Sequence, residues 1–176
     1  MWPFTRKRDK TADECWREGS RLLSLGKNAQ ALAVLKQAAE KEPSRLDGRL
    51  NLGVACYMMK QFEEAIPHFK YVLAIDNDHL MALLNLGACY DGIGDYDKSI
   101  ECLEKVCSSR PDFPDAHFNL AVAYMKKKEI DKAEEALKTE LRIRPENQLA
   151  RNALNEIYVK YPRAAPARPG PSKQTP

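Results

Sequence analysis

The sequence predicts an all-α protein in which short antiparallel helix pairs stack into a solenoid. Three observations support this: an internal repeat of 34 residues, two amphipathic helical segments in each repeat, and a turn between them. One such pair cannot bury its apolar faces alone, but stacked neighbours can cover them. With 44% apolar residues, the 176-residue chain can bury a core of this kind.

Small residues recur at a fixed spacing and define the repeat. One set falls in each first helix, and a second set falls twelve positions later, in each second helix. Small side chains there let the two helices of a pair cross closely, and a Leu would cost about 1–3 kcal/mol. The two sets are Gly19, Gly53, Gly87 and Ala121, and Ala31, Ala65, Ser99 and Ala133. Four units follow without insertion or deletion: 12–45, 46–79, 80–113 and 114–147.

The third unit shows how each repeat divides into two helices. Apolar residues lie at helical spacing from Leu80 to Tyr90, and the segment Asp-Gly-Ile-Gly-Asp at 91–95 then breaks the helix. A second helical stripe runs over 96–106, and Pro111 stops it. We therefore expect two helices joined by a short turn in every unit.

The repeat resembles that of the tetratricopeptide repeat (TPR) family across residues 12–147. The resemblance implies a right-handed α-α superhelix, the TPR solenoid. The family's first-position Trp is absent from all four units, a departure that TPR proteins tolerate. The residues that carry the resemblance are Leu52, Gly53, Ala65, Phe69, Leu86, Gly87, Tyr90 and Pro111.

Three further segments surround or complete the repeats. Residues 148–161 continue the register for half a unit, and we expect a comparatively polar capping helix that ends a TPR domain spanning 12–161. Residues 162–176 hold five of the 11 prolines and should form a disordered tail. Residues 1–11 are expected to be a flexible basic segment.

The charge is unevenly distributed along the chain. The formal net charge of +3 divides into +3 for residues 1–11, −4 for 12–159 and +4 for 160–176. The near-neutral total argues against a dedicated nucleic-acid-binding protein. No apolar run approaches the roughly 20 residues of a membrane-spanning helix, and the N-terminus lacks the apolar stretch of a secretory signal.

Cysteine and histidine usage argues against disulfide, metal and catalytic sites. The five cysteines are odd in number and include no C-x-x-C pair, so we expect reduced, mostly buried thiols and a cytoplasmic location. The three histidines, His68, His79 and His117, lack Cys or carboxylate partners at ligand or triad spacing. We expect a protein that is not an enzyme and holds no metal or cofactor.

A concave groove is the site that the resemblance implies, because in TPR proteins one face of the first helices holds a peptide or a partner helix. Here that face is mainly apolar, and a helix that is apolar on two faces needs a partner to cover the second. Trp16 and Phe118 are the expected hot spots. The expected lining is Trp16, Ser20, Leu50, Asn51, Val54, Tyr57, Met81, Leu84, Asn85, Ala88, Phe118, Asn119, Val122 and Met125.

Three asparagines recur in register within this lining: Asn51, Asn85 and Asn119. Their amides can donate and accept, and they resemble the asparagine ladder with which some TPR superhelices hold an extended peptide backbone. Asparagine is also frequent at this position in idealised TPR sequences. Both interpretations stay open.

The sequence therefore predicts a non-catalytic adaptor or scaffold that binds a peptide or amphipathic helix in an apolar, Asn-lined groove. The alternative is a self-assembling homo-oligomeric scaffold, in which one subunit's N-terminal segment enters the next subunit's groove. Some bacterial TPR scaffolds, such as magnetosome-associated ones, are similar in plan.

The N-terminal segment itself has three competing interpretations. It is disordered, it docks into a groove, or it contacts an anionic membrane surface, which would make the protein peripheral at a membrane. The residues available for membrane contact are Trp2, Phe4, Arg6, Lys7 and Arg8.

Overall fold

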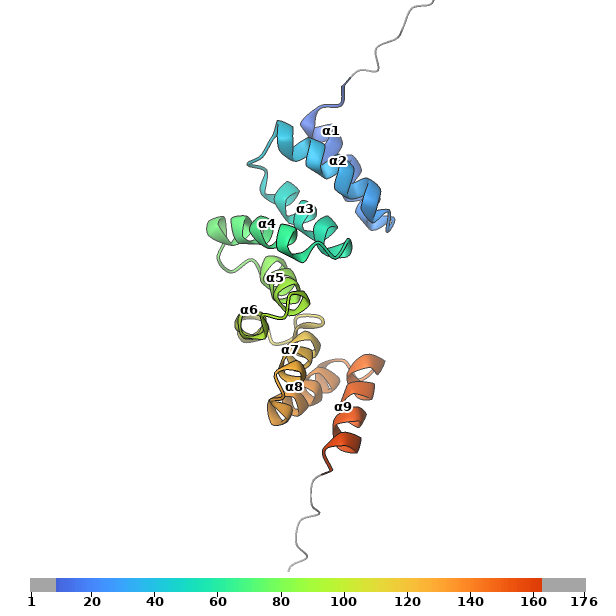
Figure 1. Ribbon diagram of the computed structural model, residues 1–176, viewed down its shortest axis with the longest axis vertical. Helices are drawn as coiled ribbons and strands as arrows, with labels where there is room; N and C mark the ends of the chain where they lie inside the picture. Colours follow the sequence, from blue (N-terminus) through green and yellow to red (C-terminus); the bar gives the residue numbers. More distant parts are fainter. Residues whose placement is uncertain (1–8, 163–176) are drawn as a thin grey trace, which may run out of the picture.

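The computed structural model describes residues 9–162, which form nine α-helices and no strand. Figure 1 shows that the helices follow one another along the long axis of the molecule, from α1 at one end to α9 at the other. The helices are α1 (Ala12–Ser24), α2 (Asn28–Lys41), α3 (Leu46–Met58), α4 (Phe62–Ile75), α5 (Leu80–Gly92), α6 (Tyr96–Ser109), α7 (Ala116–Lys126), α8 (Ile130–Ile143) and α9 (Gln148–Lys160).

Each 34-residue unit contains one helix pair, and the pairs stack in sequence order. The most extensive helix contacts lie within the pairs α1–α2, α3–α4, α5–α6 and α7–α8, followed by contacts from each second helix to the next first helix. The first helices α1, α3, α5 and α7 also touch one another in turn. They therefore form one shared face of the solenoid, and that face positions the candidate site.

The turn inside each unit passes through a left-handed residue. Gly26, Lys60, Gly94 and Lys128 have φ values of 68°, 59°, 83° and 63°, and they recur at the repeat spacing. This series places the end of α5 later than the sequence predicted, since the helix continues through Asp91 and Gly92.

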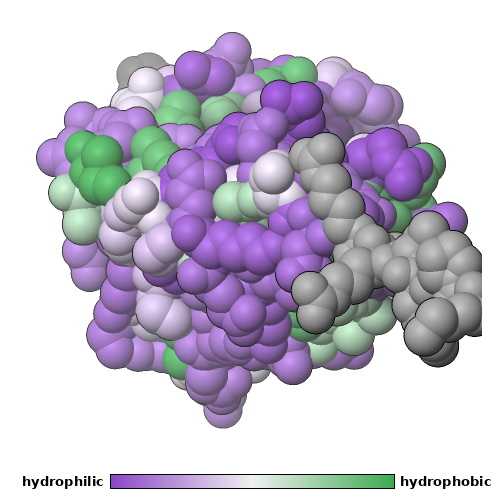
Figure 2. All heavy atoms as spheres, turned by 90° about the horizontal axis from the view of Figure 1, so that it is seen from above, coloured by the Kyte–Doolittle hydropathy of each residue, from purple (hydrophilic) through white to green (hydrophobic). Residues whose placement is uncertain are grey.

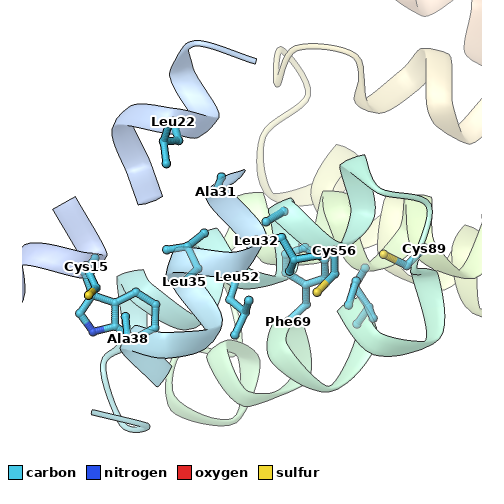
Figure 3. Close-up of a cluster of buried hydrophobic side chains, with 14 of the residues drawn as sticks. Cys15, Leu22, Ala31, Leu32, Leu35, Ala38, Leu52, Cys56, Phe69 and Cys89 are labelled. Carbon is cyan, nitrogen blue, oxygen red and sulfur yellow. The ribbon is translucent and has the colours of Figure 1, made fainter. Parts of the chain in front are cut away.

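The buried side chains form an N-terminal core from Cys15 to Cys102, a C-terminal core from Ile100 to Ile157, and a small cluster of Leu83, Val106 and Ala116. Figure 3 shows the buried side chains of the first repeats following one another from Cys15 to Cys89. In the first three units, a large side chain of the second helix fills the space left by a glycine of the first helix. A β-carbon on Gly53 would lie 2.8 Å from the Phe69 ring, and one on Gly87 would lie 2.9 Å from Leu103.

The N-terminal end of the domain is anchored before residue 12. The Thr11 side chain accepts a hydrogen bond from the backbone N–H of Glu14, and the Glu14 carboxylate accepts one from the N–H of Thr11. Lys10 pairs with Glu18, and its carbonyl accepts a hydrogen bond from Lys41. Lys10 and Thr11 thus contact the first two helices, next to the segment 1–11 that the sequence predicts to be flexible.

The remaining expectations for the two ends cannot be compared with this structure. The aromatic and basic residues proposed for docking or membrane contact lie outside the described residues. The same holds for 163–176, nearly all of the proline-rich tail.

Helix α9 closes the described array, and it carries apolar side chains on its exposed as well as its buried part. It buries Ala150 and Ile157, while Leu149 is 65% and Val159 80% exposed. Figure 2 looks along the long axis from the α1 end of the molecule. The surface seen there carries mainly hydrophilic side chains with small separate hydrophobic patches. Among residues 9–162, no helix combines the length and apolar character needed to cross a membrane.

Candidate peptide-binding groove

The face shared by the first helices carries most of the predicted groove residues as half-buried apolar side chains. Leu50, Val54 and Tyr57 of α3 pack against the edge of the N-terminal core. On α5 and α7, Leu84 and Phe118 pack against the C-terminal core in the same way. The outer part of each side chain stays accessible, so these residues form an apolar strip that we call the groove.

The remaining predicted apolar residues complete the groove. Ala88, Val122 and Met125 are half-buried, and Met81 is 46% exposed. Ser20 is exposed at the N-terminal end. The face thus offers a continuous series of side chains from α3 to α7 that a ligand can cover.

Trp16 does not line the groove, which corrects the prediction that it is a binding hot spot. Its side chain is 2% exposed, and its ring packs so close to Gly48 that a β-carbon on that residue would lie 2.8 Å from ring atoms. The indole fills space between α1 and α3, and its N–H has no hydrogen-bond partner. Phe118, the other proposed hot spot, remains partly accessible on α7.

The three asparagines of the predicted ladder have three different environments. The Asn51 amide donates to Ser20 Oγ at 2.8 Å, and the Asn85 amide donates to the Met81 carbonyl of its own helix at 2.7 Å. Asn119 lines a cavity in the groove. The amides are therefore not presented equivalently, and a ladder role remains a proposal.

A cavity of about 70 Å³ lies in the groove at the third repeat. It gathers predicted groove residues from three first helices. It also includes Asp91, which the sequence places at the end of the groove face of the third unit, and two second-helix residues, Ser99 and Leu103, that were not predicted to line the groove. We call it the third-repeat cavity. Its lining is Tyr57, Ala88, Asp91, Ser99, Leu103, Asn119 and Val122.

Asp91 dominates the electrostatics of this cavity. Its Oδ2 lies 2.5 Å from Lys126 Nζ, which links α5 to α7, while its Oδ1 is buried and has no hydrogen-bond partner. The Ser99 hydroxyl is likewise buried without a partner. Burial raises the pKa of the Tyr57 hydroxyl, with further contributions from Cys89 and Asp91, so Tyr57 is neutral at neutral pH.

Asp91 and Ser99 both depart from the pattern of the repeat. The sequence places Asp91 at the end of the groove face but also in the turn that ends the helix, whereas in the structure it occupies the last turn of α5 and lines the cavity. Ser99 had been read only as a small packing residue. A comparison of the four units at these positions would have revealed them, since the other units carry apolar residues there.

The histidines have local structural roles. The His79 side chain accepts from the Ala82 N–H at the start of α5, and His117 Nε2 lies 2.9 Å from the Pro111 carbonyl. Burial, together with the nearby Arg49 guanidinium, lowers the pKa of His68. Within the described part of the chain, no group of three or more His, Cys, Asp or Glu side chains is placed to hold a metal ion.

Comparison with protein families accounts for this architecture. Models described as tetratricopeptide repeat or TPR repeat match residues 17–80, 57–106, 93–128 and 114–147. The chain belongs to the tetratricopeptide repeat family. The described fold is accordingly a TPR superhelix, and this TPR protein has the architecture of a protein-interaction scaffold. No match is found among the curated proteins.

Solved structures of similar fold include other TPR superhelices. MamA 41-end from Desulfovibrio magneticus RS-1 is 25% identical, with a TM-score of 0.77 over 86% of each chain. The MamA RS-1 ArsTM double mutant is also 25% identical, with a TM-score of 0.76 over 86% of this chain and 85% of that one. The APC/C hetero-tetramer Cut9–Hcn1 is 22% identical, with a TM-score of 0.78 over 84% of this chain and 30% of that chain, and it shows the fold alone.

Proposed function

We propose that this TPR protein is a non-catalytic adaptor that holds a peptide or an amphipathic helix against its groove. The observation that carries the proposal is the strip of half-buried apolar side chains shared by α3, α5 and α7. Covering such a strip removes apolar surface from water, which contributes roughly 25 cal/mol per Å². The ligand therefore has an apolar face of its own.

Polar groups in the same strip give the bound segment a direction. Asn119 makes no side-chain hydrogen bond among residues 9–162, so its amide is available to the backbone or side chain of a ligand. Apolar contacts supply most of the affinity in such grooves, and a few placed polar groups fix orientation. The ligand class is thus a peptide with an apolar stripe and a polar interruption.

Charge reversal in the groove tests the proposal. Immobilised protein is used to capture partners from a native extract, and Met81→Glu should abolish recovery of the captured proteins. Met81 is 46% exposed, so this change leaves the core intact. Leu84→Glu and Phe118→Glu should act in the same way, with circular dichroism to confirm that helicity is retained.

Val159→Glu is the matched control, because this residue of α9 is 80% exposed and lies outside the groove. Recovery should be unchanged in this variant. If Met81→Glu and Phe118→Glu both retain their helicity and still recover the same proteins, the groove is not the binding surface.

A homo-oligomeric scaffold is the second candidate function. The observation in its favour is charge complementarity, since residues 1–11 carry +3 and residues 12–159 carry −4. The similarity to MamA structures at 25% identity is consistent with it but does not favour it over the adaptor. Light scattering of the full chain and of a chain lacking residues 1–8 distinguishes the two, because a monomer in both samples at high concentration contradicts self-assembly.

Peripheral membrane contact by the same N-terminal segment is a separate proposal, based on its aromatic and basic residues. Cosedimentation with vesicles of phosphatidylcholine and phosphatidylserine tests it. Binding should depend on the anionic lipid and should disappear when residues 1–8 are removed.

A further inference from the structure

We propose that the third-repeat cavity receives the basic side chain, a lysine or an arginine, of the peptide bound in the groove. This inference rests on the proposed function and adds the chemistry of one ligand residue. It places a specific acceptor, the Asp91 carboxylate, at a defined point of the groove.

At two positions that line this cavity, the third repeat carries a polar residue that the other three lack. In the other units an apolar side chain stands at the position of Asp91, and an alanine stands at the position of Ser99. Two polar replacements in one unit thus meet at one cavity. The residues that the other units carry are Leu23, Tyr57 and Met125, and Ala31, Ala65 and Ala133.

Two polar atoms of the cavity lack partners within the described part of the protein. Ser99 is 0% exposed, and its hydroxyl makes no hydrogen bond. Asp91 Oδ1 is also buried and accepts no hydrogen bond. Because buried polar groups are nearly always paired, and an unpaired buried carboxylate oxygen is especially unfavourable, these atoms favour a ligand that brings N–H donors.

The sign of the charge follows from the cavity and its surroundings. A carboxylate forms its strongest hydrogen bonds with cationic donors, and the domain over 12–159 is acidic overall. Lys126 occupies only the second carboxylate oxygen, and the Lys126 and Asp91 side chains are 41% and 24% exposed. Because solvent reaches the Lys126 side of this ion pair, the pair contributes little, and an incoming cation can compete with Lys126.

The size and walls of the cavity suit the end of a long basic side chain. Ala88, Leu103 and Val122 provide apolar walls along which the methylenes of lysine or arginine can lie. With a volume of about 70 Å³, the cavity has room for the terminus of a long side chain.

Small cations test the cavity without a peptide. The full chain is titrated with n-butylguanidinium chloride or n-butylammonium chloride, and with n-butanol as the uncharged probe, while the backbone amide signals of Ala88, Asn119 and Val122 are followed by NMR. The cations should produce saturable shifts at these residues, and n-butanol should not.

Three variants connect the binding to the named groups. Asp91→Asn should weaken cation binding by about tenfold or more, because the hydrogen bond to a charged acceptor is lost. Ser99→Ala should weaken it less. Lys126→Met should strengthen it by a few-fold, because the competing cation is removed.

Asp97→Asn is the matched control. Asp97 belongs to the same repeat and pairs with Lys127 at 2.6 Å, but it does not line the cavity. Cation binding should be unchanged in this variant. If Asp91→Asn fails to fold, Lys126→Met still tests the proposal, because the proposal requires Lys126→Met to bind the cations more tightly.

Equal binding of n-butanol, or weaker binding of the cations after Lys126→Met, would overturn the proposal. Unchanged cation binding in folded Asp91→Asn would do the same. If the cations do not bind, the cavity proposal is wrong, but the proposed groove is unaffected. If the cations bind saturably and Met81→Glu still captures the same proteins, the peptide-adaptor function is wrong and the cavity proposal is not.

Discussion

The indole ring of Trp16 on α1 lies against the backbone of Gly48 on α3, where a β-carbon would come within 2.8 Å of ring atoms Cε2 and Cζ2. This contact joins the first two repeats and keeps Trp16 buried. A tryptophan that would otherwise stand on the groove face therefore serves the packing between repeats.

Gly48→Ala is expected to lower the free energy of unfolding by about 1–3 kcal/mol, because the large aromatic ring cannot yield to the added methyl group without local repacking. The helix preference of alanine, roughly 0.5–1 kcal/mol, offsets only part of this loss. Urea unfolding measures the change. The same substitution in a Trp16→Leu background should show a smaller loss, and equal losses in both backgrounds would exclude the contact as the cause.

Lys60→Gly is expected to stabilise the protein by up to about 1 kcal/mol, because a residue with a side chain is disfavoured in the left-handed region. Lys60 has a φ of 59° in a turn where two of the other units carry glycine. Lys60→Ala is the control, since it removes the same side chain without relieving the backbone. Thermal unfolding should show a gain for glycine only.

Alkaline pH is expected to destabilise the fold through its buried thiols. Burial raises the pKa of Cys56, Cys102 and Cys107 to about 11 and that of Cys89 to about 12, from an ordinary value of 9.0. Below pH 9 the thiols are protonated in both states. Above it the unfolded chain loses protons that the folded chain retains, so the free energy of unfolding falls as the pH rises from 9 to 11.

Urea unfolding at a series of pH values measures this fall. Lysine and tyrosine side chains also titrate in that range, so the comparison is with Cys89→Ala, whose stability should decrease less steeply with pH. Parallel curves for the two proteins would show that the Cys89 thiol does not contribute.

Glu140→Ala is expected to lower the free energy of unfolding by about 1–3 kcal/mol and to loosen α9, because it leaves the half-buried Asn147 amide without its acceptor. Glu140 is 1% exposed and accepts a hydrogen bond from the Asn147 amide at 2.7 Å. Asn147 also caps α9 through the Ala150 N–H. Amide hydrogen exchange should increase in α9, whereas the exposed Glu135→Ala should leave it unchanged.

The helix pairs could be predicted from the sequence because every unit repeats the same local rules. The small residues at positions such as Gly53 and Gly87 face large side chains of the partner helix, and this pairing occurs within one unit. The end of α5 was placed too early because the pair Asp91-Gly92 looks like a turn. The helix in fact persists until the left-handed Gly94 redirects the chain.

The site was less predictable because contacts between neighbouring repeats determine which residues line the groove. The burial of Trp16 depends on Gly48, which is not part of either series of small residues. The cavity likewise combines Tyr57 from the second unit with Asp91 from the third and Asn119 from the fourth. A face assigned from one helix at a time identifies candidate residues, but it does not show which of them meet.

An array of nearly equivalent units presents a ligand with several nearly equivalent places to bind, each displaced by one repeat from the next. Asp91 and Ser99 stand in the third unit alone, and the cavity that they line interrupts this translational equivalence. If a peptide shifted by one repeat, its basic side chain would no longer meet the Asp91 carboxylate and would lie against Tyr57 or Met125 instead. Because only the third unit departs from the repeat in this way, it fixes the register in which a peptide binds along the groove.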